Sequence, residues 1–72
     1  MTQNITSIVL KQSPTELYKI LKFEGLVASG GEAKQVIADG KVKVNGDTET
    51  RKRKKIISGD IISYDDHTLH IS

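Results

Sequence analysis

The spacing of apolar residues changes at Gly40, and this change limits the possible folds more than any other feature. Before Gly40, apolar residues recur every three or four positions, as on one face of an α-helix. After it, Val42 and Val44 alternate with lysines, which is typical of a strand with one buried side. The following Asn45-Gly46 tolerates the positive φ angles of a tight hairpin. A helical segment followed by short strands predicts an α+β fold with a small, mainly antiparallel sheet.

Two capping signals predict two helices before Gly40. Residues 13–16, Ser-Pro-Thr-Glu, form a capping box with proline at the first helical position. Gly25 can end that helix in a left-handed conformation. Ser29 and Glu32 form a second capping box, and Gly40 ends the second helix. The apolar residues expected to face the core from these helices are Leu17, Ile20, Leu21, Ala33, Val36 and Ile37.

The remaining apolar segments are short and rich in β-branched residues, which predicts strands. They are residues 5–10, residues 42–44 with a return through Thr48 and Thr50, residues 61–64, and a last strand with Leu69 and Ile71. Ile56 and Ile57 are expected to return to the core, and Phe23 and Tyr64 to lie in the core or at its edge. Turns are predicted at residues 58–60 and 65–67.

The length of 72 residues predicts a single domain spanning residues 1–72. The chain has no cysteine, which excludes disulfides, zinc fingers and thiol catalysis. No apolar run approaches the roughly 20 residues that cross a bilayer, and residues 5–10 lack the features of a secretory signal. We therefore expect a soluble cytoplasmic protein that does not bind membranes.

Candidates for catalysis or metal binding are few. His67 and His70 lie near Asp65 and Asp66, but their spacing matches no metal motif, and these residues suit a turn and an exposed strand face. No Gly-x-Ser-x-Gly elbow is present. We expect no enzyme activity, no catalytic residue, no metal, no cofactor and no small-molecule substrate.

Gly30-Gly31, at the start of the second predicted helix, has two interpretations. Its amides could bind a phosphate, although the Gly-Lys-Ser or Gly-Lys-Thr of a nucleotide-binding loop does not follow. Alternatively, the two glycines could let the helices cross closely. The two interpretations are compatible with each other and with the sequence.

The basic residues are concentrated in one part of the chain. Residues 34–55 hold eight bases and three acids, a net charge of +5, whereas the rest holds three bases and six acids, a net charge of −3. The eight bases are Lys34, Lys41, Lys43, Arg51, Lys52, Arg53, Lys54 and Lys55. Segregated charge of this kind predicts a polyanionic partner on one face.

The run from Arg51 to Lys55 could also protect a sheet edge, or serve as a targeting signal or a general polyanion patch. Its position favours nucleic acid, because it follows a hairpin whose exposed side already carries Lys41 and Lys43. Lys34 lies off the apolar stripe of the preceding helix. If the run is a strand, Arg51, Arg53 and Lys55 share one face, and Lys52 and Lys54 the other.

The aromatic residues are Tyr18, Phe23 and Tyr64, and none lies in the basic segment. This argues against proteins that read single strands by stacking several bases. A rigid basic surface with few aromatic residues is better suited to the shape and phosphates of folded RNA.

Four ordered segments resemble the S-four-type RNA-binding domain, the alpha-L motif found in ribosomal protein S four. They are residues 25–29 (Gly-Leu-Val-Ala-Ser), 33–37 (Ala-Lys-Gln-Val-Ile), 40–46 (Gly-Lys-Val-Lys-Val-Asn-Gly) and 59–62 (Gly-Asp-Ile-Ile). The resemblance covers about residues 15–64. Residues 22–25, 29–33 and 49–53 resemble the small, free-standing bacterial YbcJ-like members of this family.

The resemblance implies two helices packed on a small bent sheet, with RNA held along the second helix and the following hairpin. By position, the implied RNA contacts are Ser29, Lys34, Gln35, Lys41, Lys43, Arg51, Lys52, Arg53, Lys54 and Lys55. Many members have an arginine directly after the serine that begins the second helix, where this chain has Gly30. The catalytic activities of the family reside in other attached domains, which also implies that this chain is not an enzyme.

The expected function is binding of structured RNA, namely ribosomal RNA or a ribosome-assembly intermediate, by neutralisation of phosphates with little base reading. A protein-binding adaptor, with its basic face on an acidic partner protein, is the alternative. An architectural DNA-binding protein is less well supported, because the second helix offers only Lys34 and Gln35 to a major groove and no dimer seam is evident.

Overall fold

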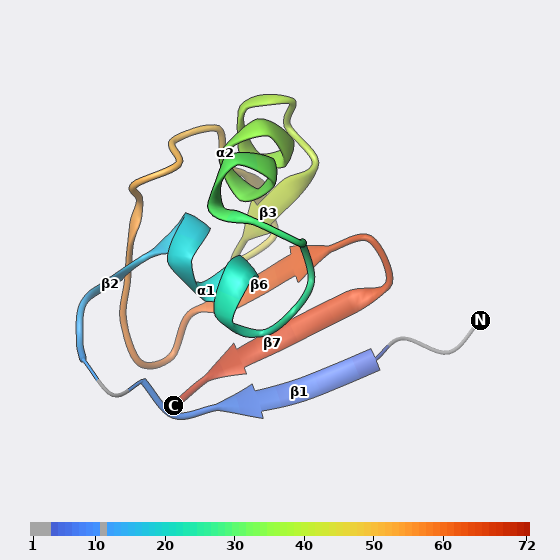
Figure 1. Ribbon diagram of the computed structural model, residues 1–72. Helices are drawn as coiled ribbons and strands as arrows, with labels where there is room; N and C mark the ends of the chain where they lie inside the picture. The colour runs from blue at the N-terminus through green and yellow to red at the C-terminus, as the bar shows by residue number, and fades with distance from the viewer. Residues whose placement is uncertain (1–3, 11) are drawn as a thin grey trace.

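The computed structural model describes residues 4–10 and 12–72, and both helices lie on one side of a twisted sheet (Figure 1). The predicted α+β fold is thereby confirmed. The elements in chain order are β1 (Asn4–Ile8), β2 (Thr15–Glu16), α1 (Leu17–Phe23), α2 (Gly30–Ala38), β3 (Val42–Val44), β4 (Asp47–Thr48), β5 (Lys55–Ile56), β6 (Ile61–Tyr64) and β7 (His67–Ile71).

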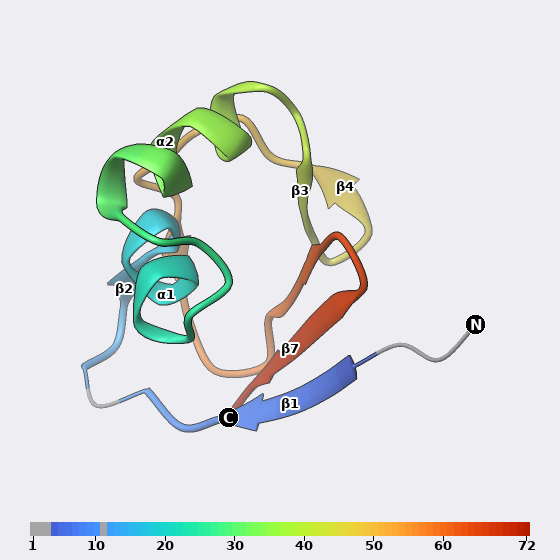
Figure 2. The same cartoon turned by 45° about the vertical axis from the view of Figure 1, so that its right-hand side comes forward.

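The main sheet has five strands in the order β1-β7-β6-β3-β4, and β2 and β5 form a separate two-stranded ladder. Strand β1 runs parallel to β7, and the other pairs of the main sheet are antiparallel. The register places Val44 opposite Ile62, and Ile62 opposite Leu69. These inward side chains therefore form one apolar row across the sheet. Figure 2 shows the sheet curving from β1 and β7 toward β3 and β4.

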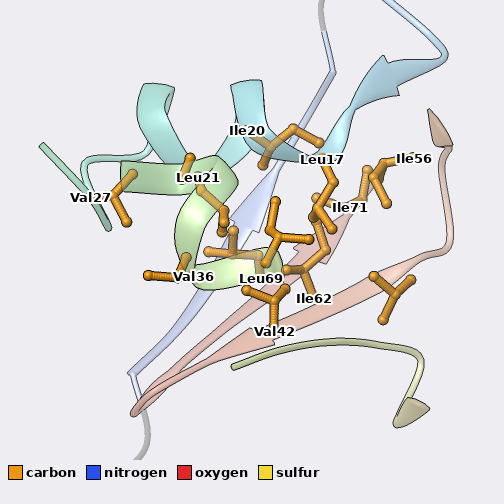
Figure 3. Packing of buried hydrophobic residues seen from close by; sticks show 13 residues of the cluster. Leu17, Ile20, Leu21, Val27, Val36, Val42, Ile56, Ile62, Leu69 and Ile71 are labelled. Carbon is orange, nitrogen blue, oxygen red and sulfur yellow. The ribbon is translucent and has the colours of Figure 1, made fainter. Parts of the chain in front are cut away.

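The core lies between this sheet and the two helices (Figure 3). Every apolar residue predicted to face the core from the helices is buried, and all buried side chains in the described part of the chain are apolar. The buried residues are Leu17, Ile20, Leu21, Val27, Ala33, Val36, Ile37, Val42, Val44, Ile56, Ile62, Leu69 and Ile71. Burial of the apolar face of each helix explains why helices this short are stable, since tertiary packing rather than intrinsic helix propensity supplies most helix stability.

Two residues expected in the core are exposed instead. Phe23 is 72% exposed, because it lies two positions after the buried Leu21 and so points to the opposite side of the helix. Ile57 is 52% exposed, because it follows the buried Ile56 and successive side chains of an extended chain point in opposite directions. Tyr64 is half-buried against the core, as predicted.

The start of α1 differs from the prediction. The helix begins at Leu17, and its N-cap residue is Glu16, whose side chain makes no capping hydrogen bond. Ser13 therefore does not cap this helix. Residues 15 and 16 instead form β2 and pair with β5. The long-range ladder determines the backbone conformation here and overrides the local capping signal.

The second helix and both helix ends agree with the prediction. The Ser29 hydroxyl accepts a hydrogen bond from the Glu32 amide at 3.1 Å, and the Glu32 carboxylate accepts one from the Ala28 amide at 2.7 Å. Gly25 and Gly40 have φ angles of 72° and 77° directly after the two helices. Such left-handed residues let the following amides bond back to the last helical turn.

The hairpin after Gly40 also forms as predicted. Asn45 and Gly46 have φ angles of 54° and 87°, and Val44 pairs with Asp47 across the turn. Both oxygen and nitrogen of the Asn45 side chain are used: Oδ1 accepts from the Ile61 amide at 2.9 Å, and Nδ2 donates to Asp60 at 3.0 Å. The turn is thus fixed to the start of β6. Thr50 lies beyond β4, which ends at Thr48.

Candidate nucleic-acid interface

The basic run folds as a turn rather than a strand. Residues 51–54, called here the basic loop, close through a hydrogen bond from the Lys54 amide to the Arg51 carbonyl at 3.1 Å. Only Lys55, directly after the loop, belongs to a strand. The predicted alternation of Arg51, Arg53 and Lys55 against Lys52 and Lys54 is therefore wrong. A turn points its side chains in several directions, so the two sets do not form opposite faces.

The backbone of the basic loop is attached to the first turn of α1. The Leu17 amide donates to the Lys54 carbonyl at 2.9 Å, and the Tyr18 amide donates to the Lys52 carbonyl at 3.1 Å. The first amides of a helix have no acceptor within the helix. Here the carbonyls of the basic loop accept their hydrogen bonds, in place of a side-chain cap. The loop, which is part of the longer orange segment in Figure 1, is consequently held beside α1.

Arg51 is paired with a neighbouring carboxylate. Its Nε lies 2.8 Å from Oε2 of Glu49 and its Nη2 lies 3.3 Å from Oε1, while its backbone amide donates to Oε2 at 3.1 Å. The hydrogen bond from the Arg51 side chain holds the pKa of Glu49 below its usual value, although partial burial opposes the shift. This pair fixes the start of the basic loop, and Glu49 competes with any phosphate for Arg51.

Glu16 holds a second, looser pair. Its carboxylate lies 3.2 Å from Nζ of Lys19 and 4.0 Å from Nε of Arg53. The pKa of Glu16 is lowered, chiefly by the hydrogen bond from Lys19. Both arginines of the basic loop therefore face carboxylates. Among the described residues, the ion pairs involve none of the lysines from 34 to 55.

The two hairpin lysines lie in different places, and Lys43 is not on the helix side of the sheet with the basic loop. Val42 and Val44 point into the core, so Lys43 between them points to the opposite face of the sheet. There it lies between Thr48 and Ser63 in the strand register. Lys41 is exposed at the junction of α2 and β3. The structure thus separates Lys43 from the helix side, as its alternation with the buried Val42 and Val44 requires.

The polar residues predicted on α2 are already hydrogen-bonded. The Ser29 hydroxyl caps the helix, and Nε2 of Gln35 donates to Asp39 at 2.9 Å. Lys34 is half-buried, and its Nζ lies 4.8 Å from the centre of the Tyr18 ring. Tyr18 is the functional candidate that the sequence analysis missed. It lies outside the basic segment in sequence, and only the packing of α1 on α2 brings it beside Lys34.

The glycines at the start of α2 are not required by close helix packing. A Cβ built on Gly30 would lie 4.0 Å from two atoms of the Tyr18 ring, and one on Gly31 would lie 3.8 Å from the Ser29 hydroxyl. Both are ordinary contacts, so a β-carbon would fit at either position. The interpretation that these glycines permit a close crossing is therefore wrong.

Residues 4–10 and 12–72 contain no group of three or more acidic, histidine or cysteine side chains that could hold a metal ion. None of the helices in these ranges has the length and apolar character needed to cross a membrane.

Comparisons with known proteins agree with this architecture. A protein from Escherichia coli (strain K12) named "Putative RNA-binding protein YbcJ" is 46% identical over 61 residues, which cover 85% of this chain and 87% of that protein. A protein from Shigella flexneri named "Uncharacterized protein YbcJ" matches with the same identity and coverage.

A solved structure matches as well. The solution structure of YbcJ from E. coli, described as revealing an alpha-L motif involved in RNA binding, has a TM-score of 0.66 and 41% identity. The match covers 99% of this chain and 89% of the solved one. The family model described as the S4 domain matches residues 8–72. This chain therefore belongs to the S4 domain family, and its two helices and mixed sheet form the alpha-L fold.

Proposed function

We propose that this chain, acting as one domain over residues 1–72, binds structured RNA, either ribosomal RNA or that of a ribosome-assembly intermediate. The observation that carries the proposal is the attachment of the basic loop to α1 through the Leu17 and Tyr18 amides. Because of this attachment, the lysines of the basic loop and the lysine of α2, which packs beside α1, lie on a surface that is formed before RNA binds. The relatives described as RNA-binding support the same function.

Binding occurs through phosphate neutralisation. Each lysine that meets a phosphate releases condensed counterions, and this release makes affinity strongly dependent on salt. Because the loop backbone is already ordered, little conformational entropy is lost when RNA binds. The proposed contacts on the helix side are Lys34, Lys41, Lys52, Lys54 and Lys55, with Lys43 reaching RNA that extends around the β3–β4 edge.

Base reading plays a small part in this proposal. Ser29 and Gln35, the uncharged polar residues of the site, already make hydrogen bonds within α2. Backbone phosphates and the shape of an A-form helix are therefore the features that this surface recognises. A folded RNA that presents phosphates along a helix and an adjoining loop suits a surface built from a helix and a loop.

Fluorescence anisotropy with a folded ribosomal RNA fragment and a duplex DNA of similar charge tests the proposal. The double variant Lys52→Gln/Lys54→Gln removes two proposed contacts. The control Lys19→Gln/Lys22→Gln removes the same number of charges from α1, where Lys19 is paired with Glu16. We expect tighter binding to the RNA than to the DNA at near-physiological salt. The loop variant should lose at least about tenfold in affinity and the control should lose far less.

Three results would count against the proposal. Equal, weak binding to both nucleic acids that vanishes with salt would reduce the surface to a general polyanion patch. Equal losses of RNA affinity in the loop variant and the control variant would show that the position of the removed charges does not matter. A protein partner that stays bound in nuclease-treated lysate would favour the adaptor function. Sequencing of RNA cross-linked to the protein in cells tests the ribosomal assignment, which requires enrichment of ribosomal RNA.

A further inference from the structure

We propose that Tyr18 is a positioning residue of the RNA-binding surface, whose ring holds the Lys34 ammonium at the junction of α1, α2 and the basic loop. This inference rests on the proposed RNA-binding function. It adds to that function an aromatic residue from outside the basic segment and assigns it a defined role.

The first observation is the geometry of the pair. Nζ of Lys34 lies 4.8 Å from the centre of the Tyr18 ring, well within the roughly 6 Å over which a cation is attracted to an aromatic face. Lys34 is also half-buried. A lysine gains such burial by laying its aliphatic stem along an apolar surface while its ammonium stays accessible. For comparison, Lys19 lies 6.0 Å from the same ring, at the limit of the interaction.

The second observation is that Tyr18 itself is held in place. Its amide donates to the Lys52 carbonyl at 3.1 Å, and its half-buried ring packs against the hydrophobic core. Tyr18 is thus bonded to the basic loop through its backbone and contacts Lys34 through its ring. The ammonium of Lys34 and the backbone of Lys52 are therefore both positioned by one residue.

The third point is that the ring and a phosphate can share the ammonium. A lysine ammonium has three N–H donors, so one can face the ring while the others bind phosphate oxygens. A lysine already confined over the ring loses less rotamer freedom on binding than a freely moving one. Tyr18 therefore increases the contribution of Lys34 to affinity without contacting RNA itself.

The test combines nuclear magnetic resonance of the free protein with RNA binding. A proton near the face of an aromatic ring resonates at an upfield shift. We therefore expect upfield-shifted Lys34 side-chain protons in the wild type and in Tyr18→Phe, and ordinary shifts in Tyr18→Leu. Tyr18→Leu should weaken binding to the ribosomal RNA fragment by about two- to fivefold, the range of an exposed cation–π contact. Tyr18→Phe should restore binding.

A double-mutant cycle separates positioning from direct contact. If the ring acts through Lys34, Tyr18→Leu has no further effect once Lys34→Gln is present. The variant Tyr64→Leu is the matched control, since it shortens another half-buried tyrosine that packs against the core. Its effect on RNA affinity should be small and equal with and without Lys34→Gln. This control distinguishes a general loss of packing from a loss of Lys34 positioning.

The inference fails in three ways that differ from failure of the proposed function. Ordinary Lys34 shifts in the wild type would show that the ring does not hold the ammonium. An equal loss from Tyr18→Leu with and without Lys34→Gln would show that the ring acts independently of Lys34. Weakening by Lys34→Gln with no effect of Tyr18→Leu would remove the role of Tyr18 alone. By contrast, absence of RNA binding by the wild type would refute the proposed function itself.

Discussion

The ion pair between Arg51 and Glu49 predicts that neighbouring basic side chains of the basic loop contribute unequally to RNA binding. Glu49 contacts the Arg51 side chain at 2.8 and 3.3 Å, whereas the ion pairs of the described residues do not involve Lys52. A phosphate must displace a carboxylate to reach Arg51, but only water and counterions to reach Lys52. The variants Arg51→Gln and Lys52→Gln remove the same charge from adjacent positions and so form a matched pair.

The expected salt dependence of RNA binding follows from the number of lysines that are available to phosphates. Within the described ranges, six lysines of the proposed site lie outside all ion pairs: Lys34, Lys41, Lys43, Lys52, Lys54 and Lys55. If each meets one phosphate, the slope of log affinity against log salt is about −4 to −5.5. Lys52→Gln should make the slope shallower by about 0.7 to 0.9, and Arg51→Gln should leave it nearly unchanged. Lys43→Gln should have the smallest effect among the lysines.

The assay is anisotropy with the folded RNA between about 50 and 200 mM salt, a range over which several phosphate contacts change affinity strongly. Glu49→Gln provides the reciprocal test, because it leaves Arg51 without its acidic partner. We expect a steeper slope by about 0.7 to 0.9 for this variant. If Arg51→Gln flattens the slope as much as Lys52→Gln does, the ion pair does not withhold Arg51 from RNA, and the reasoning is wrong.

Three further predictions concern stability. Leu69→Ala, at a side chain that is 1% exposed, should lower the free energy of unfolding in urea by about 2 to 5 kcal/mol, and a loss below about 1 kcal/mol would contradict tight packing there. Ser29→Ala should cost about 1 kcal/mol in the same assay by removing the cap of α2, so an unchanged midpoint would show that the cap is dispensable. The pKa values of Glu16 and Glu49 lie below their ordinary 4.5 in the folded protein, so both carboxylates stabilise it above about pH 4.5 and lose this effect as pH falls through the lowered values. The melting temperature should therefore fall less on acidification in Glu16→Gln/Glu49→Gln than in the wild type, and an equal fall would refute this assignment.

Features that depend on neighbouring residues were predictable from the sequence. The cap formed by Ser29 and Glu32, the glycines that end both helices and the Asn45-Gly46 turn all form as expected. Each involves residues no more than a few positions apart, so its geometry is available to the chain before the rest has folded. The buried residues of both helices follow from their spacing for the same reason.

Features that depend on distant partners were not predictable. A strong capping signal at Ser13 is unused, because the pairing of β2 with β5 moves the start of α1 to Leu17. The basic run looks like a strand in isolation, but its carbonyls accept hydrogen bonds from the α1 amides, and it folds as a turn. In both cases a donor or acceptor from a remote segment outcompetes the local preference.

The sequence by itself determined the α+β class, the two helices, the hairpin and the segregation of positive charge, because periodicity, capping and composition act locally. Only the tertiary structure decided how that charge is presented. It attached the basic loop to α1 and placed Tyr18 beside Lys34. These arrangements join segments far apart in the chain, and contacts of that kind exist only once α1, α2 and the sheet have packed around a common core.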